Sequence, residues 1–239
     1  MKPLAAQLRL ELTLLARNGE SLLLTLGIPT LLLVFFAKVD VLPIDGEAID
    51  FLAPGVLALA VLSTALVNLA ISTGFDREYG VLKRLGATPL GRPRLLAAKT
   101  LAVLVVEVVQ IAVLWVIALA VGWDPTVAPA GFVVAVVLGT VACAGIGLCL
   151  AGSLKALVTL AAANGLYLVL LLLSGMVIPL DKLPSGARAL ARALPSGALA
   201  EAVRGSLTAD LSVPGRAWLV LAIWAVAAPL VATRLFRWE

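Results

Sequence analysis

Apolar residues along the chain gather into six long runs, separated by short breaks that contain proline, glycine or charged residues. A helix needs about 20 mostly apolar residues to cross the hydrocarbon core of a bilayer. Each run is near that length, so the pattern predicts six transmembrane helices. Their expected bounds are 21–37, 51–75, 96–121, 129–151, 156–178 and 216–236.

Residues 1–20 follow a different pattern, in which leucines alternate with charged residues at helical spacing. The leucines are Leu4, Leu8, Leu12 and Leu15, and the charged residues between and after them are Arg9, Arg17 and Glu20. This pattern is typical of an amphipathic helix that lies in the membrane surface. We expect such a helix and not a cleaved signal peptide, because no small-x-small cleavage site follows the first run.

The composition agrees with a membrane protein and excludes several other classes. The chain has 239 residues, of which 62% are hydrophobic and 13% charged, whereas soluble domains contain about 45–50% apolar and about 25% charged residues. It has no histidine and only two cysteines, which excludes histidine-dependent catalysis and a thiolate zinc site. We expect a single, all-α polytopic membrane domain with no catalytic, cofactor or metal site of its own.

The positions of Lys and Arg predict the orientation of the chain in the membrane, because cytoplasmic loops are enriched in these residues. One side would carry 12 of the 18 cations, in the N-terminal segment, the loop between the second and third runs, the turn at Lys155 and the C-terminus. The other side would carry six, of which five lie in the segment after the fifth run and one is Lys38. Both termini are therefore expected in the cytoplasm.

The loop 76–95 has the features of a folded element. Asp76 could cap a short helix that Gly86 would end, and Thr88-Pro89 or Arg92-Pro93 would begin the next helix, since proline suits the first turn. The apolar residues on one face of the short helix would be Val81, Leu82 and Leu85. The loop thus predicts a short helix at the cytoplasmic membrane face, able to dock in a groove of a partner. A plain positive-inside anchor is the alternative.

Glu107 is the one acidic residue deep inside a predicted span. An acid at the bilayer centre costs about 2.5–3.5 kcal/mol on insertion scales, so its presence calls for a reason. Gln110 lies three positions further along and should share the same helix face. Two interpretations stay open: a polar spot on a substrate path, and a packing contact with another helix or a water-filled crevice.

Other polar and small residues form stripes within the predicted spans. The stripe on the second span consists of Thr64, Asn68 and Ser72, and the small-residue face on the fourth span consists of Gly139, Cys143, Gly147 and Ala151. Both stripes favour contacts between helices, although a substrate lining is open for the first one. Asn164 and Tyr167 on the fifth span are further candidates for a substrate path.

The segment 180–214 is cut by Pro184 and Pro195 into pieces too short to cross a membrane. The apolar residues at helical spacing in its first part are Leu183, Ala187, Leu190 and Leu194. Backbone that enters a membrane without crossing it is tolerated where protein or water satisfies its polar groups. We expect two short, half-buried helices here, with an ordinary surface loop as the alternative.

Two sequence motifs resemble a known family. The run FDREYGVLKRLGATPL at 75–90 is similar to the cytoplasmic coupling loop of type-2 ABC exporter permeases, in particular the daunorubicin-resistance subfamily of drug-efflux permeases. The run SGMVIP at 174–179, together with the later Leu-Pro pairs and EAVR at 201–204, is similar to the family's segment after the fifth span. The residues that carry this second similarity include Gly175, Pro179, Pro184, Pro195 and Arg204, and by resemblance the segment is an outer re-entrant one.

The resemblance implies a six-helix permease that pairs with a second permease half, expected here as a homodimer, and with two ATP-hydrolysing subunits. No G-x-x-x-x-G-K-[ST] sequence occurs in the chain, so ATP and Mg²⁺ would be bound by the partner. The residues implied to couple to that ATPase subunit are Asp76, Arg77, Glu78, Tyr79, Gly80, Lys83 and Arg84. The expected substrate path combines Asn68, Glu107, Gln110, Asn164 and Tyr167.

The expected function is therefore that of a permease subunit, not itself an enzyme, in the bacterial cytoplasmic membrane. With the ATPase partner it would export hydrophobic or amphiphilic substrates such as drugs, lipids or lipid-linked glycans, and it would have no nucleic-acid partner. The alternatives are a proton-coupled secondary transporter that uses Glu107, and a non-transporting ABC-like assembly or signalling module. An intramembrane enzyme is disfavoured, since histidine and a second deep acid are both missing.

Overall fold

The computed structural model describes residues 2–17, 19–38, 48–88, 91–208 and 212–236, and these ranges contain helices and no strand. The predicted all-α class is confirmed. The elements are α1 (Lys2–Arg17), α2 (Gly19–Lys38), α3 (Ala48–Leu62), the π-helical η1 (Ser63–Asn68), α4 (Leu69–Glu78), α5 (Val81–Gly86), α6 (Arg92–Ala120), α7 (Pro129–Ser153), α8 (Ala156–Leu172), the 3-10 helix η2 (Leu180–Lys182), α9 (Ser185–Ala193), α10 (Pro195–Leu207) and α11 (Gly215–Leu235).

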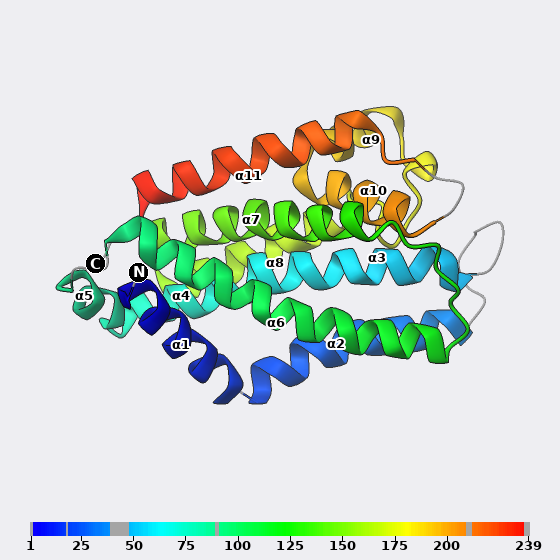
Figure 1. Ribbon diagram of the computed structural model, residues 1–239. Helices are drawn as coiled ribbons and strands as arrows, with labels where there is room; N and C mark the ends of the chain where they lie inside the picture. The colour runs from blue at the N-terminus through cyan, green and yellow to red at the C-terminus, as the bar shows by residue number, and fades with distance from the viewer. Residues whose placement is uncertain (1, 18, 39–47, 89–90, 209–211, 237–239) are drawn as a thin grey trace.

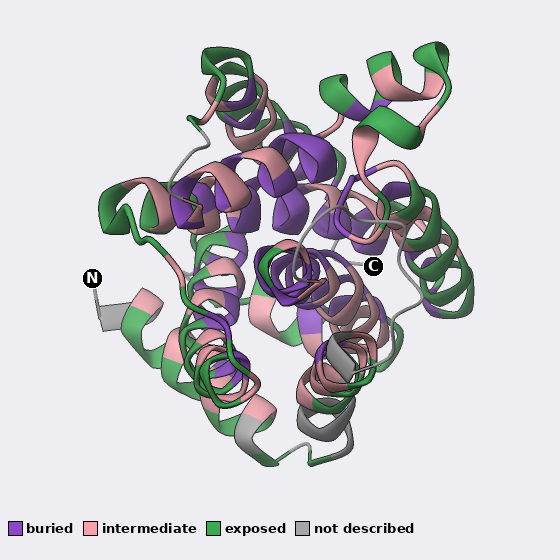
Figure 2. Cartoon of the chain, turned by 90° about the vertical axis from the view of Figure 1, so that its right-hand side faces the viewer, coloured by how far each residue is buried: buried purple, intermediate pink, exposed green. Residues whose placement is uncertain are grey.

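The long helices lie side by side in one bundle (Figure 1). Both chain ends and α5 lie at one end of this bundle, and α9 and α10 lie at the other. Buried residues concentrate on the inner helices, whereas the outer helices carry many exposed positions (Figure 2). Large apolar side chains such as Val108, Leu157 and Leu219 are among those exposed, which is the surface that a lipid-embedded bundle presents.

Among the described residues, four helical stretches are long and apolar enough to cross a membrane: Ala48–Glu78, Arg92–Ala120, Pro129–Ser153 and Gly215–Leu235. The first of them runs without a break through α3, η1 and α4. Shorter apolar helices occupy Thr25–Phe36 and Ala156–Leu172. All six coincide with predicted runs, and the number of actual crossings stays a prediction.

The fifth predicted span is too long at its C-terminal end. Helix α8 ends at Leu172, six residues before the predicted limit at Ile178. The Ser174 hydroxyl donates to the carbonyl of Leu171 and accepts from the N–H of Met176, and Gly175 has a φ of +76°. A side-chain hydrogen bond that replaces the helical one, followed by a left-handed glycine, ends the helix there.

The small-residue face of α7 is confirmed as a close-packing surface. A Cβ added at Gly147 would lie 2.6 Å from the carbonyl oxygen of Leu66 in η1, and one added at Gly139 would lie 2.5 Å from the side chain of Leu199 in α10. Because Gly147 carries no Cβ, α7 approaches the backbone of the continuous helix formed by α3, η1 and α4, which we call the central helix. Gly139 in the same way lets the side chain of Leu199 pack against α7. The contact at Gly147 fixes η1, which carries part of the cavity described next.

Candidate functional site

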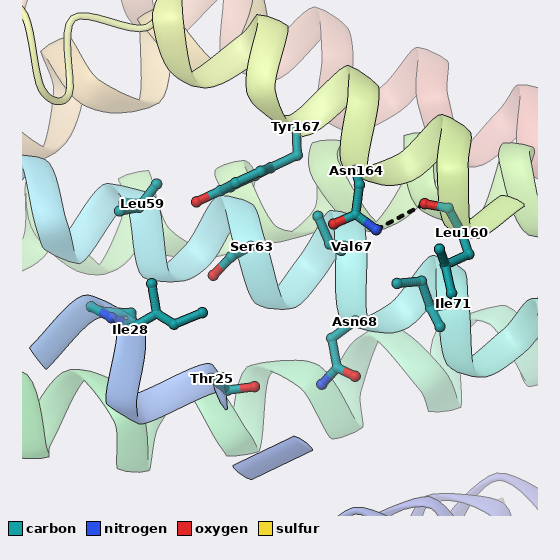
Figure 3. A pocket seen from close by; sticks show the side chains of 11 residues that line it. Thr25, Ile28, Leu59, Ser63, Val67, Asn68, Ile71, Leu160, Asn164 and Tyr167 are labelled. Carbon is teal, nitrogen blue, oxygen red and sulfur yellow. Dashed lines mark hydrogen bonds between the residues drawn. The ribbon is translucent and has the colours of Figure 1, made fainter. Parts of the chain in front are cut away.

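A cavity of about 350 Å³ opens between α2, α8 and the continuous helix formed by α3, η1 and α4 (Figure 3). Its lining is mainly apolar, with a few polar side chains. The lining residues are Thr25, Ile28, Pro29, Leu59, Ser63, Val67, Asn68, Ile71, Leu160, Asn164 and Tyr167. Three of the five residues predicted for a substrate path, Asn68, Asn164 and Tyr167, thus meet at one cavity.

The polar groups of the cavity come from facing helices (Figure 3). Tyr167 extends from α8 toward Leu59 and Ser63 on the opposite wall, and the amide of Asn164 donates to the carbonyl of Leu160 on its own helix at 2.8 Å. An apolar cavity with a few separated hydrogen-bonding groups suits an amphiphilic molecule better than a strongly charged one.

The π-helical η1 decides which residues of the second span reach the cavity. Thr64 is buried and donates to Oε1 of Gln110 at 2.9 Å, whereas Ser63 and Asn68 line the cavity. Ser72 donates to the carbonyl of Leu69 on its own helix. Thr64 therefore makes the contact between helices that the stripe predicted, whereas Asn68 and Ser72 have different surroundings. Hydrogen bonding of the i→i+5 type rotates the residues of η1 relative to a regular helix, so the three side chains do not share one environment.

Glu107 and Gln110 are buried but do not line this cavity. Gln110 lies behind its wall, where its amide donates to the carbonyl of Thr25 at 2.7 Å. Glu107 accepts a hydrogen bond from Thr140 of α7, and its second oxygen has no partner among the described residues. The two side chains thus contact different neighbouring helices. Helix packing accounts for both, and their place on a substrate path stays a prediction.

The predicted coupling segment begins as a direct extension of the central helix. Helix α4 continues to Glu78, Gly80 turns the chain with a φ of +71°, and α5 then occupies Val81–Gly86. The short helix and its end at Gly86 are as predicted, and Leu82 anchors it as a fully buried side chain. The next helix begins at Arg92 with Pro93 in its first turn, whereas Pro89 of the other predicted start lies outside the described residues.

The predicted cap of α5 is wrong. Asp76 lies within α4, and the residue before α5 is Gly80, which makes no side-chain capping bond. The carboxylate of Asp76 instead contacts Nζ of Lys99 on α6 at 2.8 Å. Asp76 is drawn into the molecule because a long-range ion pair is available to it, and a capping bond is not required where a left-handed glycine begins the helix.

The predicted coupling set consists of Gly80 and six residues with side chains, and these six divide into two groups by the direction in which their side chains lie. Arg77 also turns inward, where its Nη1 donates to the carbonyl of Ala151 on α7 at 3.0 Å. The members that are exposed are Glu78, Tyr79, Lys83 and Arg84, and Tyr79 has an exposed fraction of 71%. A protein that binds this end of the bundle would therefore meet the second group, while the first group holds the segment in place.

Lys99 forms an ion cluster that the sequence did not reveal. Its Nζ lies 3.0 Å from a carboxylate oxygen of Glu11 on α1 and 2.8 Å from Asp76, and only 1% of its side chain is exposed. Gln7 donates to Glu11 at 2.7 Å. We call Gln7, Glu11, Asp76 and Lys99 the Lys99 cluster; it joins the N-terminal helix, the end of α4 and α6.

One comparison with known proteins decides the family. The model of the ABC-2 type transporter family matches residues 4–208, which is most of the chain. The chain belongs to the ABC-2 type transporter family. It is accordingly an integral membrane protein and a permease subunit of an ABC-type transporter, a class whose transmembrane subunit works with a partner ATPase subunit. A search of curated proteins finds no match, and the daunorubicin-like subfamily stays a prediction.

At the opposite end of the permease, the segment after α8 folds back onto the central helix. The two predicted short helices are present as α9 and α10, with Pro184 directly before the first and Pro195 in the first turn of the second. A Cβ added at Gly55 of α3 would lie 2.1 Å from the carbonyl oxygen of Met176. This close approach, which only glycine permits, seats the segment against α3. Its depth in a membrane stays a prediction.

Arg204 of α10 holds this folded-back segment together. Its guanidinium lies 4.0 Å from the centre of the Phe51 ring and donates to the carbonyl of Gly175 at 3.1 Å. Burial lowers the pKa of Arg204 to about 10, and the nearby Glu201 acts in the opposite direction. The residue therefore keeps its charge at neutral pH and ties α10 both to the start of α3 and to the turn that follows α8.

Proposed function

We propose that this permease is the membrane-spanning half of an exporter that moves hydrophobic or amphiphilic substrates, such as drugs, lipids or lipid-linked glycans, across the bacterial cytoplasmic membrane. Membership of the ABC-2 type family supports a transport role. The observation that carries the substrate class is the cavity of about 350 Å³, whose apolar walls hold Ser63, Asn68, Asn164 and Tyr167 as separate hydrogen-bonding groups. An apolar substrate with a small polar part is complementary to such a lining.

The energy would come from two ATPase subunits, which would bind ATP and Mg²⁺ and contact the exposed side chains Glu78, Tyr79, Lys83 and Arg84. Two copies of the permease would complete the transporter, with both termini in the cytoplasm. The support for this arrangement is positional, because both ends of the chain and α5 lie at one end of the bundle (Figure 1). An ATPase bound there would be on the cytoplasmic side.

The route from the ATPase to the substrate is short in this chain. The helix that ends at Glu78 is the same continuous helix that carries Ser63, Asn68 and Ile71 along one wall of the cavity. A push on α5 would therefore reach a cavity wall through only the two-residue turn at Tyr79 and Gly80. Closure of the ATPase subunits would change the cavity and open it toward the outer side, where the segment held by Arg204 packs against the start of α3.

A proton-coupled transporter that works without an ATPase is the competing function. Its proposed proton carrier, Glu107, contacts Thr140 and is not part of the cavity lining. A carrier that shares no space with the substrate has no direct means of exchanging a proton for it, which favours the ATP-driven mechanism.

Transport in proteoliposomes tests the proposal. The permease would be reconstituted with and without its ATPase partner, and daunorubicin and a fluorescently labelled phospholipid would be the probes. We expect MgATP-dependent movement of at least one probe with the partner present, and none with the permease alone. Movement by the permease alone that follows an imposed proton gradient would overturn the proposal, and so would absence of any ATP-dependent movement of both probes.

A further inference from the structure

The Lys99 cluster occupies a position from which it can control both walls of the cavity. One of its carboxylates, Asp76, lies on α4. This helix is continuous with η1, whose Asn68 lines one wall of the cavity. The other, Glu11, lies on α1, and the chain passes from α1 into α2, whose Thr25 and Ile28 line the facing wall. Lys99 thus joins the cytoplasmic extensions of two helices between which the cavity lies.

We propose that Lys99 is a positioning residue that makes α1 follow the ATPase-facing segment, and that its contact with Asp76 is made and released during the transport cycle. The inference deepens the proposed function and rests on it. When the contact is made, displacement of α5 and the end of α4 carries α1 and then α2 with it. When it is released, the two cavity walls move separately.

Stability alone does not account for this arrangement. Apolar side chains of similar volume usually stabilise a buried position as well as an ion pair does, because charges must be stripped of water before they pair. An ionic contact differs from an apolar one in that it depends on direction and distance and has two distinct states, paired and solvated. Such a contact suits a joint between moving elements.

The two carboxylates of the cluster are not equivalent. Glu11 has only 11% of its side chain exposed and is also held by Gln7, whereas Asp76 has 28% exposed and stands two residues before the end of α4. Water can therefore replace Lys99 at Asp76 at lower cost than at Glu11. Two carboxylates also share one ammonium, so Lys99 keeps a partner when Asp76 leaves. Asp76 is the releasable contact and Glu11 the permanent one.

The test follows the movement of α1 directly. Spin labels would be placed at Thr13 on α1 and at Arg234 on α11, both exposed, in a chain with Cys143→Ala and Cys149→Ala. The distance between the labels would be measured by pulsed electron paramagnetic resonance in the complex with the ATPase subunit. The two states to compare are the nucleotide-free complex and the complex trapped with MgATP and vanadate. The variants are Asp76→Asn and Glu11→Gln, and Asp124→Asn, an exposed acid between α6 and α7, is the matched control.

We expect trapping to change the distance with Asp76 and Glu11 intact and in Asp124→Asn, and to produce less than half of that change in Asp76→Asn and in Glu11→Gln. Glu11→Gln should lower the thermal unfolding midpoint more than Asp76→Asn does. A full distance change in both variants would overturn the inference while leaving the proposed function standing. No change even with both carboxylates present would instead count against ATP-driven movement, and thus against the proposed function.

Discussion

Two buried side chains of opposite charge, Lys99 and Glu107, lie on the same helix and are treated differently by their surroundings. Each has about 1% of its surface exposed. Lys99 is matched by two carboxylates from two other elements, whereas Glu107 has one hydroxyl partner, Thr140, and no cation within ion-pairing distance among the described residues. The comparison indicates that the charge of Lys99 is required by its partners, whereas Glu107 contributes through its size and one hydrogen bond.

The largest effect is expected where a charge is removed from a matched cluster. Lys99→Met keeps most of the side-chain volume but leaves Glu11 and Asp76 close together without a cation. Removal of one partner from a buried ion pair costs about 3–5 kcal/mol. The free energy of unfolding, measured by titration of mixed micelles with sodium dodecyl sulfate, should fall by that amount. A loss below about 1 kcal/mol would contradict the view that Lys99 carries a required charge.

A smaller effect is expected when Glu107 loses its partner. Thr140→Val keeps the shape of the side chain and removes the one hydroxyl that contacts the carboxylate. A buried polar group left without a hydrogen bond costs about 1–3 kcal/mol, and the same titration measures the loss. Thr100→Val is the matched control, because the Thr100 hydroxyl donates to the carbonyl of Leu96 on its own helix and not to a carboxylate of the described residues. Equal losses in the two variants would show that the Glu107 contact contributes nothing specific.

The smallest effect of the three is expected for Glu107→Gln. The amide keeps a hydrogen-bonding oxygen for Thr140 and removes no partner of a cation, so the free energy of unfolding should change by less than about 1 kcal/mol. Transport should continue with at most a changed preference among probes. A loss as large as that of Lys99→Met would show that the Glu107 charge is needed, and the two residues would then no longer differ in kind.

The cavity permits a comparison of two neighbouring side chains on α8. Tyr167 lines the cavity and Leu168 is exposed outside it. Tyr167→Ala should alter ATP-dependent uptake of the probes at least threefold, because it enlarges the cavity and removes a hydroxyl, whereas Leu168→Ala should leave uptake within twofold of the unsubstituted permease. Matching uptake in both variants, measured in proteoliposomes, would remove the cavity from the substrate path.

The helices of this chain were predictable because hydrophobicity and length are local properties. The runs identified six apolar helices, and the prolines and glycines identified α5, α9 and α10. The end of α8 was missed since it depends on one hydroxyl, Ser174, replacing a backbone bond. The rotation of the η1 residues relative to a regular helix was missed, because a π-helical turn alters the hydrogen-bond register and does not depend on a particular amino-acid composition.

The Lys99 cluster was missed for a different reason. Glu11 and Asp76 lie 88 and 23 residues from Lys99 along the chain, so no local pattern links them. A lysine at the start of a span also looks like one of the cations that cytoplasmic loops ordinarily carry. One local signal was available. Leu95, four residues before Lys99, and Ala102, three residues after it, are both buried, so helical periodicity alone would have put Lys99 on the inner face of α6.

The most direct test of the account asks what touches the segment after the second span. A photo-crosslinking amino acid in place of Tyr79, which is exposed and stacks on Phe75 of the preceding turn, would be irradiated in intact cells that also produce the ATPase subunit. We expect a crosslinked species that contains both the permease and the ATPase subunit, and none when the same amino acid replaces the exposed Leu190 of α9 at the other end of the bundle. A crosslink to the ATPase from position 190 and not from position 79 would contradict the account.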